Sequence, residues 1–244
     1  MIPKVIHYCW FGGAPLPPLA EKCITSWKKY LPGYEIRRWD EENFDVNAHH
    51  YTRDAYKAGL YAFVSDYARF KILYEQGGLY FDTDVEVIAS MDDIVGRKPF
   101  MGFENDGAEG NMAVNPGLGL GAEPGMSLYK EILDRYDTLP FMLENGDRNP
   151  YSMIALVTDL LKSKGLVGNT GIEWVGGVLV YPKCWFNPFD DATGRLGKTV
   201  NTRSIHWYSK SWMPKENGMT VFIKRVARRI FGKSFVSRLG KKIK

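Results

Sequence analysis

The 244-residue sequence has few cysteines, no long apolar run, and no acidic residue among its last 24 positions. The three cysteines, Cys9, Cys23 and Cys184, are far apart and odd in number. This argues against a disulfide framework or a metal-ligand cluster and favours a reducing compartment. No apolar run approaches the ~18 residues that a membrane-spanning helix needs. Because the first residues have a strand pattern rather than that of a secretion signal, we expect a cytoplasmic protein.

The lack of acids in residues 221–244 makes the charge distribution uneven. This segment contains nine Lys or Arg, and the remaining chain contains 23 basic and 28 acidic residues. The net charge of +4 therefore conceals a net charge of −5 outside the segment. A protein that binds nucleic acid needs its basic surface on the folded domain, so we expect no nucleic-acid partner.

Residues 222–231 alternate apolar pairs with the basic pairs Lys224-Arg225 and Arg228-Arg229. At 3.6 residues per turn, this pattern makes an amphipathic helix with one apolar and one cationic stripe. Such a helix is typical of segments that lie on an anionic membrane surface. A disordered basic tail and a nucleic-acid contact are the alternatives. We expect a folded domain at 1–218 and a basic amphipathic, membrane-associating tail at 219–244.

Strand and helix patterns alternate over the first 90 residues, which predicts an α/β fold with a mostly parallel sheet covered by helices. The expected strands are 2–11, 34–39, 79–88, 99–104, 112–121, 177–181 and 203–207, and the expected helices are 15–33, 50–76, 124–136 and 149–162.

Two carboxylates, Asp82 and Asp84, interrupt a strand pattern in the segment GGLYFDTDVE at 77–86. The aspartate content alone predicts about one Asp-x-Asp triplet by chance, so the setting of the pair matters more than the triplet. The pair follows a Gly-Gly turn and an aromatic strand, and ligands of α/β sheets bind at the carboxyl ends of strands. Carboxylate ligands suit Mg²⁺ or Mn²⁺. The alternative is a polar strand end without a ligand.

Asp66 and Arg69 are three residues apart in the preceding helical segment and therefore share a face. They could form a surface ion pair, which the spacing alone favours. They could instead contact a phosphate through the arginine and a sugar hydroxyl through the carboxylate.

The combined pattern Ser-Asp-x-x-Arg at 65–69 and Gly-Gly-x-Tyr-x-Asp-x-Asp at 77–84, with IPKVIHYCWFGG at 2–13, resembles the glycosyltransferases that carry the DXD motif. It is most similar to bacterial capsular-polysaccharide and lipopolysaccharide sugar transferases, which are related to fungal initiating mannosyltransferases and more distantly to glucosylating toxins. The resemblance covers residues 1–95 and recurs in IHWYSKSW at 205–212. It implies a GT-A-type nucleotide-sugar-binding fold, with a mixed, mostly parallel sheet flanked by helices.

The resemblance also implies a metal site for Mn²⁺ or Mg²⁺. It makes Asp84 a direct ligand, places Asp82 at the ribose and the water shell of the metal, and makes His206 the ligand that completes the set. The ending WYSKSW departs from the commoner family pattern, which has a second His or a Gly-Ser step before the final tryptophan.

The resemblance further implies a donor site and a set of catalytic residues. Trp10 would lie against the nucleotide base, and Ser211 and Trp212 would close over the leaving diphosphate. The full donor-binding set is Trp10, Asp66, Arg69, Tyr80, Asp82, Ser211 and Trp212, and the catalytic set is Asp82, Asp84, Arg69 and Trp212.

The implied reaction transfers a hexose from a UDP- or GDP-sugar to a glycan or lipid-linked acceptor and retains the anomeric configuration. The implied setting is capsular or lipopolysaccharide synthesis at the inner face of the cell membrane. A metal ion, Arg69 and His206 would stabilise the leaving diphosphate. The diphosphate oxygen would take the proton of the acceptor, so that no strong protein base is needed. The glycine-rich segment 111–125 is expected on the acceptor side.

Two alternatives remain from the sequence. FDTDVE at 81–86 also fits the haloacid-dehalogenase phosphatase signature, with Asp82 as nucleophile and Asp84 as acid. That fold places the motif on its first strand and needs a later lysine motif, whereas about 80 residues precede it here. A non-catalytic sugar-binding homologue is the second alternative.

Overall fold

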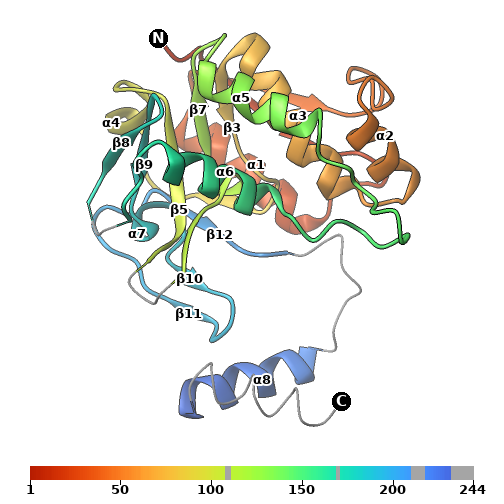
Figure 1. The fold of residues 1–244 in the computed structure, drawn as a ribbon. Helices are drawn as coiled ribbons and strands as arrows, with labels where there is room; N and C mark the ends of the chain where they lie inside the picture. The colour runs from red at the N-terminus through yellow and green to blue at the C-terminus, as the bar shows by residue number, and fades with distance from the viewer. Residues whose placement is uncertain (108–110, 169–170, 210–217, 232–244) are drawn as a thin grey trace.

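The computed structural model describes residues 1–107, 111–168, 171–209 and 218–231 (Figure 1). The first part of the chain alternates strands and helices as predicted. Its elements are β1 (Val5–Cys9), α1 (Pro18–Tyr30), β2 (Glu35–Trp39), α2 (His50–Lys57), α3 (Tyr61–Gln76), β3 (Gly78–Tyr80) and β4 (Val85–Val87).

The second part contains shorter elements. These are α4 (Asp92–Val95), β5 (Phe100–Asp106), β6 (Met112–Val114), the 3₁₀ turn η1 (Pro116–Leu118), β7 (Leu120–Ala122), α5 (Ser127–Tyr136), α6 (Met153–Ser163), β8 (Glu173–Val175), β9 (Val178–Tyr181), α7 (Lys183–Phe186), β10 (Phe189–Asp190), β11 (Arg195–Leu196), β12 (Ser204–His206) and α8 (Gly218–Phe231).

The central sheet has eight strands in the order β2-β1-β3-β7-β5-β9-β8, with β6 paired to β5. Strand β1 is parallel to both β2 and β3, and β9 is parallel to β5. Because β7 is antiparallel to both β3 and β5, the strands β1, β2, β3, β5 and β9 all run in one direction. The prediction of a mixed, mostly parallel sheet is therefore confirmed.

The sheet separates two buried apolar clusters. Helices α2, α3, α5 and α6 contribute to one cluster, and α1, α4 and α7 contribute to the other. Neighbouring strand residues alternate between them, since Leu79 and Phe100 point to the α1 side and Tyr80 and Met101 to the α3 side. On the α1 side, the buried indole of Trp27 donates a hydrogen bond from Nε1 to the carbonyl of Val85 at 2.7 Å.

The structure differs from the predicted elements in four respects. The predicted strand 79–88 is two strands, β3 and β4, which belong to different sheets. The predicted helix 50–76 is two helices, because the chain turns at 58–60 with Gly59 at a φ of 69°. The predicted strand 112–121 is divided into β6 and β7 by the turn at Pro116. The short elements α4, α7, β8, β10 and β11 have no counterpart in the predicted set.

Helix α8 has the amphipathic pattern expected from the sequence and lies next to the β10–β11 hairpin (Figure 1). None of the helices among the described residues has the length and apolar character needed to cross a membrane.

Candidate active site

The acid pair lies in the turn between β3 and β4, where the chain leaves the central sheet. Strand β4 does not continue along that sheet but pairs with β12. The antiparallel register places His206, the last residue of β12, opposite Val85. This pairing brings His206 beside Asp84, although the two residues are far apart in the sequence.

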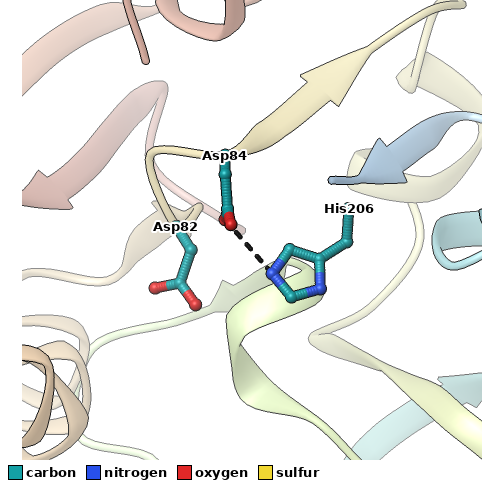
Figure 2. A group of neighbouring side chains, drawn as sticks. All are labelled: Asp82, Asp84 and His206. Carbon is teal, nitrogen blue, oxygen red and sulfur yellow. Dashed lines mark ion pairs between the residues drawn. The ribbon is translucent and has the colours of Figure 1, made fainter. Parts of the chain in front are cut away.

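Asp82, Asp84 and His206 form a compact group of potential metal ligands (Figure 2). Each offers one ligand atom, and these atoms lie within 4.8 Å of one another. The Nε2 atom of His206 is 3.1 Å from Oδ1 of Asp84. Adjacent ligands of an octahedral ion with bonds of ~2.1 Å are about 3 Å apart, so this spacing fits a small divalent cation. Carboxylates are ligands that suit Mn²⁺ and Mg²⁺, and imidazole is a common ligand of divalent transition metals.

The charges of the group compensate one another only in part. Burial opposes ionisation of Asp84, but the charge and hydrogen bond of His206, together with the Ser209 amide, lower its pKa to about 2. Burial raises the pKa of Asp82, and Arg69 only partly offsets that effect. Burial disfavours the charged form of His206, but the Asp84 carboxylate outweighs it and raises the histidine pKa. A cation at this position would favour both carboxylates in their ionised form.

Arg69 of α3 connects the helix to the acid pair. Its side chain is 3% exposed; Nη2 donates to Oδ1 of Asp66 at 2.8 Å, and Nη1 lies 3.2 Å from Oδ1 of Asp82. The guanidinium also packs over the Tyr80 ring, with Cζ 4.8 Å from the ring centroid. The Asp66–Arg69 pair is therefore not a surface ion pair, because Arg69 is buried and Asp66 is only 18% exposed. Burial raises the pKa of Asp66 to about 6.

These groups face a cavity of about 740 Å³, which is within the usual range of ligand sites. The cavity is bounded on one side by Trp10, which follows β1 and donates from Nε1 to the carbonyl of Ala14 at 2.6 Å. Ser211 and Trp212 lie outside the described residues. The other predicted site residues all line the cavity: Trp10, Asp66, Arg69, Tyr80, Asp82, Asp84 and His206.

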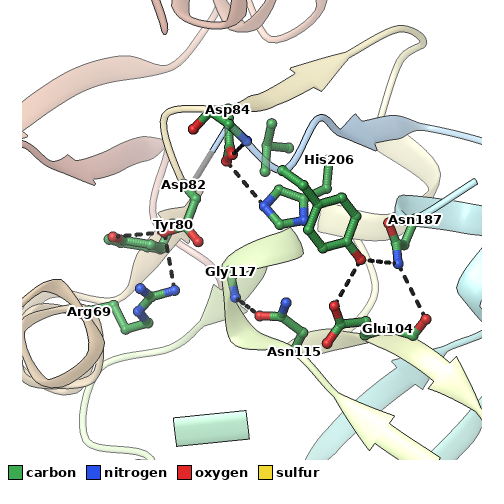
Figure 3. Close-up of polar contacts among 12 residues, drawn as sticks. Arg69, Tyr80, Asp82, Asp84, Glu104, Asn115, Gly117, Asn187 and His206 are labelled. Atoms are coloured by element: carbon green, nitrogen blue, oxygen red, sulfur yellow. Dashed lines mark hydrogen bonds and ion pairs between the residues drawn. The ribbon is translucent and has the colours of Figure 1, made fainter. Parts of the chain in front are cut away.

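Four further residues at the site have no individual signal in the sequence. Glu104, Asn115 and Tyr208 line the cavity. Gly117 packs so closely on Asp82 that a Cβ there would overlap Oδ2 of the carboxylate. Only the expectation that segment 111–125 faces the acceptor pointed towards Asn115 and Gly117. Figure 3 shows Asn115, with its Oδ1 accepting from the Gly117 amide at 2.7 Å, between the acid pair and Glu104.

Comparison with known proteins relates part of the chain to a protein family. Residues 17–101 match the family model of the glycosyltransferase sugar-binding region containing the DXD motif. An alignment of 111 residues is 27% identical to "Subversion of eukaryotic traffic protein A" of Legionella pneumophila subsp. pneumophila (strain Philadelphia 1) and covers 34% of this chain. The chain spans only 17% of the length of that relative.

Solved structures with the same fold include the one described as "PaToxG Glycosyltransferase", with a TM-score of 0.53 and 14% identity over 67% of this chain and 70% of that one. A glycosyltransferase involved in the glycosylation of the major capsid of PBCV-1 aligns with a TM-score of 0.48 and 14% identity, over 85% and 95% of the two chains.

The chain thus has a GT-A-type glycosyltransferase fold, and residues 17–101 carry the DXD glycosyltransferase region. The resemblance to DXD-motif glycosyltransferases that the sequence suggested is confirmed for this region, and the capsular or fungal subtype stays a prediction. The predicted enzyme class, a glycosyltransferase, agrees with the family match over residues 17–101.

Proposed function

We propose that the chain is a metal-dependent hexosyltransferase that uses a UDP- or GDP-sugar donor and retains the anomeric configuration. The observation that carries this proposal is the convergence of Asp82, Asp84 and His206 on one point of a cavity that also contains the buried Arg69. A cavity of about 740 Å³ has room for a nucleotide sugar.

We propose one role for each group of residues around the cavity. Mn²⁺ or Mg²⁺, held by Asp82, Asp84 and His206, would neutralise the negative charge of the donor diphosphate. Arg69 places a second, permanent positive charge next to Asp82, where it would stabilise charge on the leaving group. Trp10 offers an aromatic surface for the base, and Asp66 offers a carboxylate for a sugar hydroxyl. Ser211 and Trp212 belong to the proposed set through the family resemblance.

Retention would follow from attack on the face from which the diphosphate leaves. The acceptor hydroxyl then forms the new bond to the anomeric carbon, the bond to the diphosphate oxygen breaks, and that oxygen receives the acceptor proton. This reaction requires no strong protein base. The acceptor we propose is a glycan or a lipid-linked glycan of capsular or lipopolysaccharide synthesis.

The experiment is donor hydrolysis without acceptor, measured over a panel of UDP-, GDP- and other nucleotide sugars with Mn²⁺, Mg²⁺ or a chelator. Asp84→Asn preserves the shape of the side chain and removes its charge. We expect it to lower metal-dependent hydrolysis at least about 100-fold, as loss of one electrostatic group in an active site commonly does. Asp54→Asn is the matched control, because Asp54 pairs only with the neighbouring Arg53 among the described contacts.

Near-parental hydrolysis by Asp84→Asn, with unchanged circular dichroism, would refute the metal-site assignment. A phosphorylated Asp82 detected by mass spectrometry would instead support the phosphatase alternative, since the proposed transfer forms no aspartyl phosphate.

We also propose that residues 1–218 are the catalytic domain and that 219–244 associate with an anionic membrane at the inner face of the cell membrane. In α8, Phe222 and Ile223 are 63% and 59% exposed. Arg225 pairs with Asp191 at 2.9 Å, and Arg228 and Arg229 donate to backbone carbonyls of the β10–β11 turn. The arginines thus attach the helix to the domain, and the exposed apolar residues are the ones we expect to enter the lipid interface.

A further inference from the structure

Tyr208 follows β12 and has an unusual backbone conformation. Its φ of 52° is the only positive φ of a non-glycine residue among those the structure describes. This left-handed conformation is unfavourable for an ordinary side chain, and glycine is the usual residue there. A tyrosine at such a position is maintained by contacts of its side chain.

The hydroxyl of Tyr208 is held at two points. It donates to Oε1 of Glu104 at 2.8 Å and accepts from Nδ2 of Asn187 at 2.7 Å. Asn187 is 1% exposed and also donates to the backbone carbonyl of Glu104 at 3.2 Å. Figure 3 shows Glu104 and Asn187 on the side of His206 opposite the acid pair. The end of the Tyr208 side chain is therefore fixed to β5 and to the C-terminal end of α7.

The ring of Tyr208 contacts the imidazole of His206, with ring centroids 4.1 Å apart. A metal-binding histidine is normally oriented by a hydrogen bond from its second ring nitrogen. In this site the buried Nδ1 of His206 has no hydrogen-bond partner among the described residues. The adjacent tyrosine ring is thus the contact that restricts rotation of the imidazole on this side.

The turn at Tyr208 also directs the next amide towards the acid pair. The backbone N–H of Ser209 donates to Oδ2 of Asp84 at 2.7 Å, while Oδ1 of the same carboxylate faces His206. One residue therefore determines the position of both an imidazole and an amide that contact Asp84.

We propose that Tyr208 is a positioning residue for the metal site, anchored by Glu104 and Asn187, that holds His206 and Asp84 in the geometry that binds a divalent cation. The inference rests on the proposed function, because it assumes that these two residues are ligands.

The experiment measures Mn²⁺ affinity by electron paramagnetic resonance without donor, on purified full-length protein, for the parent and two variants. Tyr208→Phe keeps the ring and removes the anchored hydroxyl. Tyr208→Gly removes the ring and relieves the backbone strain. Tyr151→Phe is the matched control, because the Tyr151 hydroxyl donates to the Asp159 carboxylate at 2.9 Å and neither residue lines the cavity.

We expect Tyr208→Gly to weaken Mn²⁺ binding about 10- to 100-fold, as loss of an outer-shell partner does. Tyr208→Phe is expected to show a smaller loss, and Tyr151→Phe none. The free energy of unfolding of each variant is measured in parallel, because a purely structural role would lower stability and leave Mn²⁺ affinity of the folded protein unchanged.

The outcomes separate this inference from the proposed function. Mn²⁺ affinity equal to that of the parent in both Tyr208 variants would overturn the positioning role alone. A parent protein that fails to bind Mn²⁺ would overturn the proposed metal site and this inference together. Should Tyr208→Gly fail to fold, the comparison of Tyr208→Phe with Tyr151→Phe decides the question.

Discussion

The carboxylate of Asp82 is positioned by contacts on three sides. Arg69 lies 3.2 Å from Oδ1, the Tyr80 hydroxyl donates to the same oxygen at 3.3 Å, and Gly117 borders Oδ2. The backbone amide of Asp82 also donates to the Gly117 carbonyl at 3.3 Å. A small change at Gly117 should therefore affect the acid pair more than the fold.

Gly117→Ala is expected to displace the Asp82 side chain, because the new methyl group would overlap its Oδ2 atom. We expect metal-dependent donor hydrolysis to fall at least about 10-fold, since misplacing a catalytic group is costly even over short distances. Gly33→Ala is the control, because no atom lies within 4 Å of a Cβ at that position. Equal activity of the two variants would show that the position of Asp82 is not critical.

His7 is a buried histidine outside the cavity that should make stability depend on pH. The Trp39 Nε1–H can only donate, so it fixes Nδ1 of His7 as the acceptor at 2.9 Å and leaves the Nε2–H to donate to the Gly77 carbonyl at 3.1 Å. Burial lowers the pKa of His7 from 6.5 to about 4. The folded protein therefore holds this histidine neutral.

The unfolded chain takes up a proton on His7 near pH 6.5, whereas the folded protein does so only near pH 4. Because the unfolded state binds more protons in this window, the free energy of unfolding decreases as the pH falls from about 7 to about 4, by about 3 kcal/mol from this residue. Urea denaturation at several pH values checks this. His7→Gln, which does not titrate, should have a shallower pH dependence; an unchanged slope would contradict the assignment.

The short sequence motif pointed to Asp66, Arg69, Asp82 and Asp84, and the family resemblance added Trp10 and His206. Neither indicated Glu104 or Tyr208, which tertiary structure brings to the cavity. Asp66, Arg69, Asp82 and Asp84 lie within one helix–turn–strand segment, so their spacing carries information. Tyr208 and Glu104 are more than a hundred residues apart, and no local pattern relates them. Their association depends on the ends of β12 and β5 lying on the same side of the cavity.

Among the elements, those with strong start and stop signals were predicted well. Helix α1 begins at Pro18, directly after another proline, and its last turn carries Lys28 and Lys29, as the sequence suggests. Strands of two or three residues such as β8, β10 and β11 are too short to show a period of two, so their existence depends on tertiary pairing.

The turn from α3 into β3 determines where the acid pair lies. Gly77 and Gly78 have φ values of 65° and 101°, and a Cβ on Gly78 would lie 2.7 Å from the Val5 carbonyl. These two glycines allow β3 to begin immediately after the helix that carries Arg69. The distance from Arg69 to Asp82 thus depends on this tight connection.

Gly78→Ala is expected to lower the free energy of unfolding by at least about 2 kcal/mol, because it adds a steric conflict with β1 to an unfavourable φ. Gly59→Ala is the matched control, since Gly59 has a φ of 69° and no atom within 4 Å of a Cβ. We expect that control to lose only about 1 kcal/mol. Urea denaturation gives both values, and equal losses would mean that the contact with Val5 is not limiting.

At the scale of the whole molecule, parallel strands explain why distant parts of the sequence meet at one cavity. Strands β1, β3 and β5 run in the same direction. Trp10 follows the end of β1, Asp82 follows the end of β3, and Glu104 lies towards the end of β5. Ligands of such sheets bind at this edge. The alternation of strands and helices therefore predicted the position of the site, whereas the pairing of β4 with β12 that supplies His206 was not predictable from local patterns.

The position of α8 changes how its charge pattern is interpreted. The sequence alone would assign the cationic stripe to lipid headgroups, yet Arg225 contacts Asp191 and Arg229 donates from Nε to the Thr193 carbonyl at 2.6 Å. The exposed Phe222 and Ile223 are then the residues available to a membrane. This arrangement predicts that the apolar residues matter more for lipid binding than Arg225 does.

We expect the full-length protein to sediment with anionic vesicles at low salt, and truncation after Asn217 to abolish sedimentation without reducing donor hydrolysis. Phe222→Ser combined with Ile223→Ser should weaken sedimentation several-fold, because burial of the two apolar side chains in the interface contributes to membrane affinity. Arg225→Ala is the comparison, since that side chain already pairs with Asp191, and it should have the smaller effect. Comparison with vesicles of neutral lipid gives the electrostatic part of the membrane affinity. That part should decline with added salt. Equal sedimentation of the truncated protein and the 244-residue chain would show that residues 218–244 do not direct the protein to a membrane.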